Sequence, residues 1–401
     1  MSFIQGVAFS MFWTLALYFQ IKVAGLSGAQ QVLLGSVGEA AIFLCEIPTG
    51  VVADVYSRKL SIVIGYLLLG VAFAVQGFIP IWPVMIIGMV VWGVGETFLS
   101  GAKEAWVADE MAHADREDEV PMCFVSGSRI HQLGAIIGAW TGVFIGRVDL
   151  RFAPIASGVL FLLLGIALAV LLPEKGFAAA SGGRTKGWQG MVGTAGDGLR
   201  LVRRSPLLPG ILILVFVSGL ASEGFDRLWV NHLESKFTIP SLGSLGPLGW
   251  FALLASISMV LTWGVLWILE YRFARRGVAY APAMTVLNAV VGAGVVAFVW
   301  VGSFGWAVVL FLVAKSARRA MEPIRTAWVN EQSEPKVRAT MLSMSGQAHG
   351  LGEIGGGLIA AGLAAATGVR FAITFSGCVA GLVSSLWAAR LGRIEARHKG
   401  A

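Results

Sequence analysis

The sequence contains twelve charge-poor stretches of about 20 residues, and each is long enough to cross the ~30 Å hydrocarbon core of a membrane as a helix. The predicted spans run approximately over 3–23, 31–53, 60–79, 83–105, 122–146, 152–172, 207–230, 247–270, 280–301, 304–326, 339–364 and 370–390. The composition agrees, because 56% of the 401 residues are hydrophobic and 13% are charged, compared with about 25% charged in a typical soluble domain. So many apolar residues exclude a disordered chain, and so few charges cannot cover a soluble globule of this size. The sequence therefore predicts an all-α integral membrane protein and argues against an enzyme.

An even number of spans places both termini on one side of the membrane, and the Lys and Arg residues indicate which side. Eighteen of these 30 residues lie in segments on the side of the termini, whereas four lie in the opposite segments. The positive-inside rule assigns the richer side to the cytoplasm. The sequence thus predicts a multi-pass protein of the plasma or inner membrane with cytoplasmic termini. The scatter of the basic residues excludes a nucleic-acid partner and leaves membrane lipid as their expected contact.

A long connection at 173–206 divides the predicted spans into six and six. It ends in a basic, partly amphipathic stretch, which predicts a cytoplasmic linker with a surface helix. The sequence therefore predicts an N-terminal six-helix bundle over 1–172 and a C-terminal six-helix bundle over 207–401.

The two predicted bundles share a sequence pattern. Glu104–Asp109 matches Thr326–Glu331 around a common Ala-Trp-Val, and Arg129–Gly134 matches Gln347–Gly352 around a common His-x-Leu-Gly. Six spans separate the copies, so both have the same orientation in the membrane. This is the parallel repeat that secondary transporters use, with chance similarity between glycine-rich helices as the alternative.

A short motif, Gly50-Val-Val-Ala-Asp54-Val-Tyr-Ser-Arg58-Lys59, lies in the predicted cytoplasmic loop between spans two and three. Asp54 and Arg58 are spaced i,i+4, which allows an ion pair if the turn stays helical. At this loop the sequence resembles the major facilitator superfamily, whose signature is G-x-L-A-D-R-x-G-R-K. The resemblance implies twelve helices in two bundles that work by alternating access, with Gly50, Asp54, Arg58 and Lys59 as a conformational latch. The alternative interpretation is that these residues only mark topology and cap a helix.

Glycines recur every four residues on the fifth span, at Gly134, Gly138, Gly142 and Gly146, and this spacing lets helices pack closely. Antiporters of the superfamily often carry G-x-x-x-G-P-x-x-G-G there. The first three glycines fit that pattern, whereas Ala139 and Val143 depart from it. The resemblance implies a drug-efflux-like antiporter.

Charges inside the predicted spans need partners, protonation or a water-filled cavity, because inserting one costs at least about 2.5 kcal/mol. Burial favours the protonated form of a carboxyl group, so four carboxylates are candidates for proton coupling: Glu39, Glu46, Glu96 and Glu353. Other residues are candidates for lining a substrate cavity: Arg129, His131, Lys315, His349, Trp92 and Trp140. Further charges lie on span ten (Arg318, Arg319, Glu322) and span seven (Glu223, Asp226, Arg227). Static ion pairs and ordinary core packing are the alternatives for each residue.

The sequence as a whole predicts a secondary active transporter that exports small amphipathic compounds in exchange for protons. One alternative is a proton-driven importer of a nutrient or organic anion, in which Arg129 and Lys315 hold the anion. Another is a non-transporting membrane sensor or scaffold. The sequence carries no nucleotide-binding, metal-ligand or catalytic motif, and its three cysteines form no C-x-x-C pair. We therefore expect a monomer that needs no cofactor or metal and takes its energy from the proton gradient.

Overall fold

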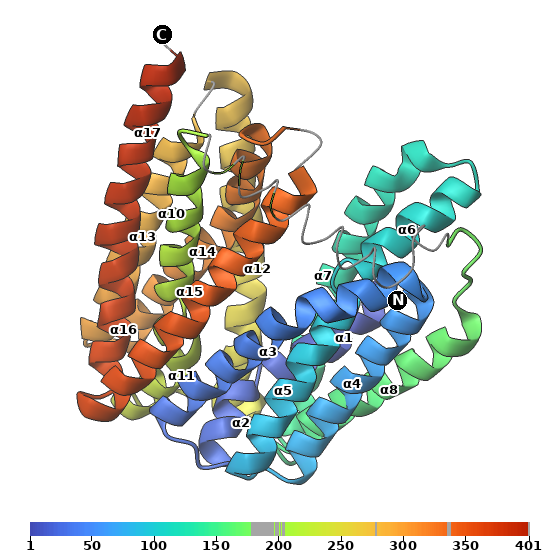
Figure 1. The fold of residues 1–401 in the computed structure, drawn as a ribbon. Coiled ribbons are helices and arrows are strands. Elements are labelled where there is room, and N and C mark those ends of the chain that lie inside the picture. The colour runs from blue at the N-terminus through green and yellow to red at the C-terminus, as the bar shows by residue number, and fades with distance from the viewer. Residues whose placement is uncertain are drawn as a thin grey trace. The chain divides into compact units, whose positions relative to one another are not determined.

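The computed structural model describes residues 1–177, 196, 200, 202, 205–276, 279–334 and 338–399 (Figure 1). Side chains are described over the same residues except 272–276, 339 and 398–399. This part of the chain forms helices joined by short loops and contains no strand. The surface helix predicted within 173–206 lies largely outside the described residues.

The first half of the chain forms eight α-helices and a short 3-10 turn. They are α1 (Ser2–Trp13), α2 (Ala16–Lys22), α3 (Gly28–Val55), α4 (Arg58–Phe78), α5 (Trp82–Leu99), α6 (Ala102–His113), η1 (Glu117–Glu119), α7 (Val120–Gly146) and α8 (Phe152–Leu171). Predicted span four is broken between α5 and α6, where Gly101 has a φ of +72°, a conformation open to glycine and costly for other residues.

The second half repeats this plan with longer helices. They are α10 (Leu208–Leu220), α11 (Glu223–Lys236), η2 (Gly243–Leu248), α12 (Gly249–Arg276), α13 (Tyr280–Trp300), α14 (Phe304–Glu331), α15 (Arg338–Ala366), α16 (Val369–Cys378), the π-helical turn η4 (Val379–Ser384) and α17 (Ser385–Lys399). Predicted spans seven and twelve are thus each formed by consecutive helices, α10 with α11 and α16 with α17.

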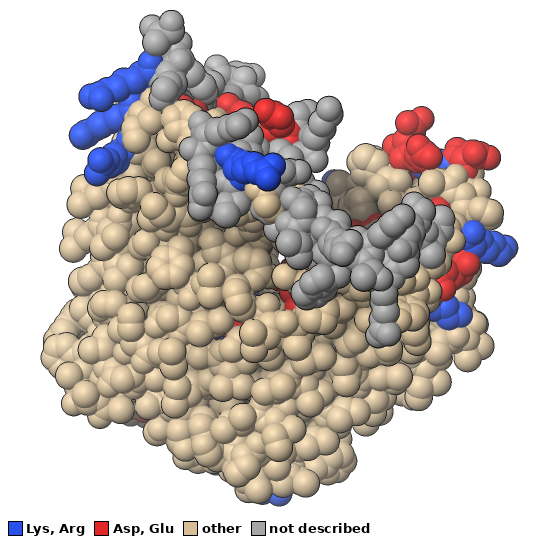
Figure 2. Space-filling model, viewed as in Figure 1, with Lys and Arg blue, Asp and Glu red and all other residues tan. Residues whose placement is uncertain are grey.

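Nine helical segments among the described residues are long and apolar enough to cross a membrane. Three further helices, α7, α14 and α15, contain 27, 28 and 29 residues and occupy predicted spans five, ten and eleven. Figure 2 shows that charged side chains on the visible face gather at the ends of the helices and that the middle is almost free of them. The prediction of an all-α integral membrane fold is confirmed.

The chain divides into two compact units. The first consists of Met1–Leu26, the described part of Val37–Gly190, and Pro240–Ala255. The second consists of Ser27–Ser36 and the described parts of Met191–Ile239 and Ser256–Ala401. The helices α3 and α12 therefore each contribute to both units. The boundaries predicted at residues 172 and 207 stay a prediction.

Among the close helix contacts built on glycine, one occurs in an equivalent form in both units. In the first unit, a Cβ added at Gly134 or Gly138 of α7 would collide with the backbone oxygen of Phe3 or Val7 of α1. In the second, a Cβ at Gly352 or Gly356 of α15 would collide with the backbone oxygen of Phe216 or Leu220 of α10. Small residues let helix backbones approach this closely. The predicted match of Arg129–Gly134 with Gln347–Gly352 pairs Gly134 with Gly352 and, continued by four residues, Gly138 with Gly356, and these glycines pack in the same way in the two units.

Candidate functional site

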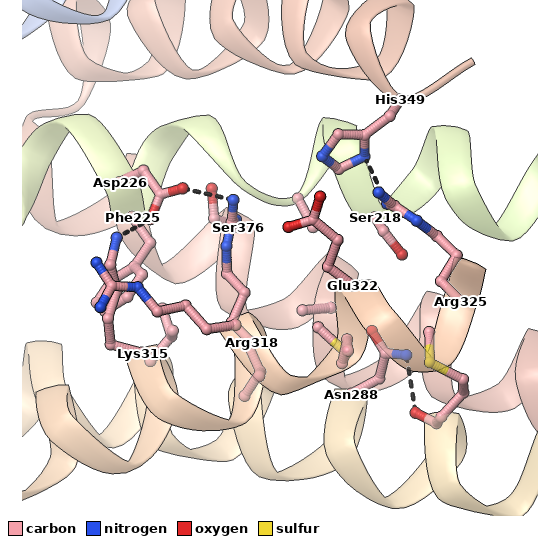
Figure 3. Close-up of a pocket in the computed structure, with 17 residues that line it drawn as sticks. Ser218, Phe225, Asp226, Asn288, Lys315, Arg318, Glu322, Arg325, His349 and Ser376 are labelled. Atoms are coloured by element: carbon pink, nitrogen blue, oxygen red, sulfur yellow. Dashed lines mark hydrogen bonds and ion pairs between the residues drawn. The ribbon is translucent and has the colours of Figure 1, made fainter. Parts of the chain in front are cut away.

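The second unit encloses a cavity of about 270 Å³ lined by α10, α11, α13, α14, α15 and α16 (Figure 3). Most of its ionisable residues come from one helix, α14. The charged or titratable lining residues are Asp226, Lys315, Arg318, Arg319, Glu322, Arg325 and His349. Lys315 and His349 were both predicted as cavity residues, and both line this cavity.

The side chains of α14 reach the cavity because they are spaced three or four residues apart. Lys315, Arg318, Arg319, Glu322 and Arg325 follow that spacing, which places them along one side of the helix. The lining from the neighbouring helix α13 is largely apolar, with Met284, Val291 and Val295. The cavity thus has one charged wall and one largely apolar wall.

Asp226 of α11 holds two of the cations. Its Oδ1 accepts a hydrogen bond from Lys315 Nζ at 2.9 Å, and its Oδ2 forms an ion pair with Arg318 Nη2 at 2.6 Å. Hydrogen bonds between charged partners are the strong ones, and a buried cation without such a partner is costly. Asp226 therefore balances charge where α11 and α14 meet.

Arg325 and His349 form a second polar pair on the cavity wall. His349 Nδ1 lies 3.2 Å from Arg325 Nη1 and 3.3 Å from the backbone oxygen of Val215. Its other ring nitrogen, Nε2, lies 3.4 Å from Glu353 Oε1. His349 thereby connects Arg325 to Glu353, one of the predicted proton-coupling residues.

The lining carries more positive than negative charge. Four cations (Lys315, Arg318, Arg319, Arg325) face two carboxylates (Asp226, Glu322), which gives a net charge of +2 with His349 neutral. Glu353 and the adjoining ion pair of Glu223 with Arg227, at 3.1 Å, bring the cluster to five cations and four carboxylates, a net charge of +1. Arg319 donates to a neutral partner, Ser258 Oγ, at 3.0 Å. One negative charge on a ligand would therefore neutralise the cluster.

The other predicted site residues lie in the first unit, away from the lining of this cavity. Glu39 and Glu46 lie half-buried on α3, Arg129 is exposed on α7, and His131 and Trp140 lie half-buried on α7. These five stay predictions.

Two further predicted residues pack in the interior of the first unit. Trp92 is 7% exposed and its ring lies edge-on against Trp13, with ring centroids 5.2 Å apart. Glu96 of α5 has a buried Oε1 with no hydrogen-bond partner among the described residues. Glu96 therefore keeps its place as a candidate for proton coupling, and Trp92 has the contacts of a core residue.

The predicted latch residues lie where α3 meets α4. Asp54 pairs with Arg58, as their i,i+4 spacing predicted, and Arg58 Nε also lies 3.5 Å from Asp109 Oδ2. Glu174, just after α8, accepts hydrogen bonds from Ser57 Oγ (2.7 Å) and from the backbone N–H of Lys59 (2.9 Å). A Cβ at Gly50 would meet open space. The cluster joins α4 to α6 and to the segment after α8, all within the first unit.

Sequence reasoning did not single out Arg325, and it noted Asp226, Arg318 and Glu322 only as charges within spans. The spacing of the α14 residues on one helical side was the signal that could have grouped them. No signal linked Asp226 to α14, since its partner Lys315 is 89 positions away.

Comparison with known proteins supports the fold and the general activity. No protein-family model matches the sequence. The chain is 24% identical over 341 residues to the uncharacterized MFS-type transporter YxaM of Bacillus subtilis (strain 168), covering 84% of this chain and 81% of that one.

Two solved structures share the fold at low sequence identity. A mutant form of the nucleoside transporter NupG is 14% identical, with a TM-score of 0.81 over 97% of both chains. A POT family transporter in complex with a thioalcohol-conjugated peptide is 12% identical, with a TM-score of 0.75 over 97% of this chain and 95% of that one. The fold is that of solved membrane transporters, and the relative that matches most of the chain is named an MFS-type transporter, so both comparisons support the predicted resemblance to the major facilitator superfamily and a transporter rather than an enzyme.

Proposed function

We propose that the protein is a proton-coupled symporter that takes up a small organic anion through the cavity of the second unit. The observation that carries the proposal is the excess of cations on the cavity wall, with Asp226 as the carboxylate that holds two of them. This function is the importer alternative predicted from the sequence, in which Lys315 and Arg129 hold the anion. Here Lys315 keeps that role, and Arg318 and Arg325 take the role of Arg129.

The size of the cavity supports a small metabolite. Its volume of about 270 Å³ lies just below the ~300–1,000 Å³ typical of pockets for drug-sized ligands. The export of amphipathic drugs, which the family resemblance implied, calls for a larger and more apolar site. NupG and the POT family transporter are named for nucleoside and peptide cargo, which is consistent with a small solute here.

The ion pairs of Asp226 suggest how a proton and an anion would be coupled. An anionic group that binds Lys315 and Arg318 has to take the place of Asp226, and protonation of Asp226 removes the competing negative charge. The proton and the anion therefore favour each other's binding, and this favourable coupling is reciprocal by thermodynamic linkage. An antiporter requires the opposite, in which the proton and the solute exclude each other.

The groups around Asp226 are consistent with this role. Lys315 and Arg318 of α14 face it, Arg319 lines the same cavity, Arg227 follows it on α11, and Ser376 of α16 also lines the cavity. We propose Glu322, Glu353 and Glu96 as secondary proton sites. In a plasma membrane with an inward proton gradient and cytoplasmic termini, symport by alternating access gives uptake, with the cluster of Asp54 and Arg58 acting as a latch. We propose a monomer that needs no cofactor.

The test is uptake of labelled organic anions into proteoliposomes with an imposed pH gradient. We expect accumulation when the outside is acidic and none without the gradient, since the proton and the anion move together. Uptake of cationic or neutral amphipathic dyes in place of anions, or anion uptake driven from the alkaline side, would contradict the proposal.

A further inference from the structure

Two serine hydroxyls that line the cavity have no hydrogen-bond partner among the described residues. They are Ser218 Oγ of α10 and Ser376 Oγ of α16, and the Ser376 side chain is 2% exposed. A buried hydroxyl left without a hydrogen-bond partner destabilises a protein, so native structures usually provide one. The proposed role of the cations does not explain these two groups.

Most hydroxyls in the helices of this chain do find partners. Ser and Thr side chains in a helix commonly donate to a backbone oxygen one turn earlier. Ser36, Thr49, Thr141, Thr262, Thr285, Ser333 and Thr374 all make that bond. Ser218 and Ser376 do not make it, although both residues line the cavity.

The two hydroxyls lie at different points of the charged wall. Figure 3 shows Ser376 beside the ion pair of Asp226 and Arg318, and Ser218 beside Glu322 and Arg325. Gly224 makes room for the first of them, because an added Cβ there would collide with Ser376 Oγ. Asn288 of α13 is a third polar group in the cavity lining. One of its amide N–H groups donates to the backbone oxygen of Met284 at 2.8 Å, and that bond does not use the second N–H.

We infer that the substrate is a hydroxylated organic monoanion, such as a sugar acid or hydroxy acid. Its anionic group binds Lys315 and Arg318, and its hydroxyls exchange hydrogen bonds with Ser376, Ser218 and Asn288. One anionic group takes the place of Asp226 on Lys315 and Arg318, and the cavity volume of about 270 Å³ suits a small acid. A site built to bind hydroxyls rejects analogues that lack them, because its own polar groups are then left without partners.

This inference rests on the proposed function and is tested with two probes of equal carbon number, D-gluconate and hexanoate. Their affinities are measured by calorimetry on the purified protein in detergent at a pH where both are ionised. We expect gluconate to bind at least roughly tenfold more tightly than hexanoate. Equal affinities, or a preference for hexanoate, would overturn the inference.

The variants Ser376→Ala and Ser218→Ala test the individual contacts. Each should weaken gluconate by roughly three- to tenfold, the usual range for one neutral hydrogen bond, and leave hexanoate unchanged. Ser384→Ala is the matched control, because Ser384 Oγ is also buried and without a partner but does not line the cavity. A loss of equal size for both probes would show a structural role for the serines and contradict the inference.

The outcomes separate this inference from the proposed function. If hexanoate binds as well as gluconate and both drive proton uptake, anion symport stands and the hydroxyl specificity fails. If neither acid binds, both proposals fail.

Discussion

The two units share a helix crossing but differ in the chemistry built around it. In the first unit the glycines of α7 pack against the backbone of α1 at Phe3 and Val7. In the second unit the glycines of α15 pack in the same way against α10 at Phe216 and Leu220. This correspondence, a shift of 213 positions, matches Trp13 with Asp226, and Ser10 and Thr14 with Glu223 and Arg227. The shared scaffold therefore carries an aromatic residue and hydroxyls in one unit and charges in the other.

The side chains at these matched positions interact in the same pattern. Ser10 Oγ and Thr14 Oγ1 lie 3.4 Å apart, whereas Glu223 and Arg227 form an ion pair at 3.1 Å. In the first unit, Trp13 packs against Trp92 in an aromatic cluster that also includes Phe12 and Phe73. At the matched position of the second unit, Asp226 forms ion pairs instead.

The other helices show the same contrast. The predicted repeat matches Gly93 and Glu96 with Lys315 and Arg318, and His131 with His349. Helix packing is thus duplicated between the units, whereas the charges at these matched positions of the second unit are not. The difference suggests that the first unit serves mainly as a rigid body and that the second unit carries the binding chemistry.

The strongest test of this contrast removes one carboxylate. Asp226→Asn keeps the size of the side chain but cannot be protonated and deprotonated, so pH-driven anion uptake should fall to the level of protein-free liposomes. Exchange of labelled for unlabelled anion should persist, which also shows that the variant is folded. Trp13→Phe, at the matched position of the first unit, should retain driven uptake. If Asp226→Asn accumulated the anion to the wild-type level, the proposed assignment of binding chemistry to the second unit would be contradicted.

The shared crossing can be tested with glycine substitutions in both units. Gly138→Ala and Gly356→Ala should each destabilise the protein by about 1–3 kcal/mol, because the new methyl group meets a backbone oxygen. Gly355→Ala, the neighbour of Gly356, should gain about 0.5–1 kcal/mol, since a Cβ there meets open space. Thermal unfolding in detergent measures all three. A loss confined to one unit would show that the crossings are not equivalent.

The two histidines should differ, although they occupy matched positions. His349→Leu should weaken anion binding by roughly tenfold, because Arg325 and Glu353 both lose a polar ring nitrogen beside them. His131→Leu should leave the affinity unchanged within twofold. Calorimetry with the same anion distinguishes them, and equal effects would place binding chemistry in both units.

The smallest effect is expected at the cluster of Asp54 and Arg58 in the first unit. The Asp54 side chain is 51% exposed, and an exposed ion pair contributes at most about 1 kcal/mol, so Asp54→Asn should change the turnover rate by at most about fivefold without changing anion affinity. Glu119→Gln, which breaks the exposed pair with Arg116, is the control and should change neither quantity. A change in affinity on Asp54→Asn would argue against a purely conformational role.

The fold could be predicted from the sequence further than the site could. The features that predicted the fold are local patterns that can be read directly from the sequence. They are the apolar stretches of membrane length, the Lys and Arg distribution and the repeated His-x-Leu-Gly. The pairing of Asp54 with Arg58 was predictable for the same reason, because the two residues lie one helical turn apart.

The cavity depends on contacts between distant helices, and its ion pairs could not be predicted. The sequence proposed Lys315 and His349 for the cavity, but nothing linked Asp226 of α11 to the residues of α14. Trp92 was chosen as a cavity residue for its aromatic character, and its ring packs in the core of the first unit. The unpartnered hydroxyl of Ser376 appears only when the neighbours of α16 are known.

The central claim is that an anion and a proton bind together at the cavity of the second unit. The direct measurement is the change in pH when an anion such as D-gluconate is added to purified protein in weakly buffered detergent solution, read with a pH indicator. The account predicts proton uptake that saturates with the anion, approaches about one proton per anion under conditions where Asp226 is ionised before binding, and disappears in Asp226→Asn. Proton release on anion binding, or binding with no change in pH at any starting pH, would contradict it.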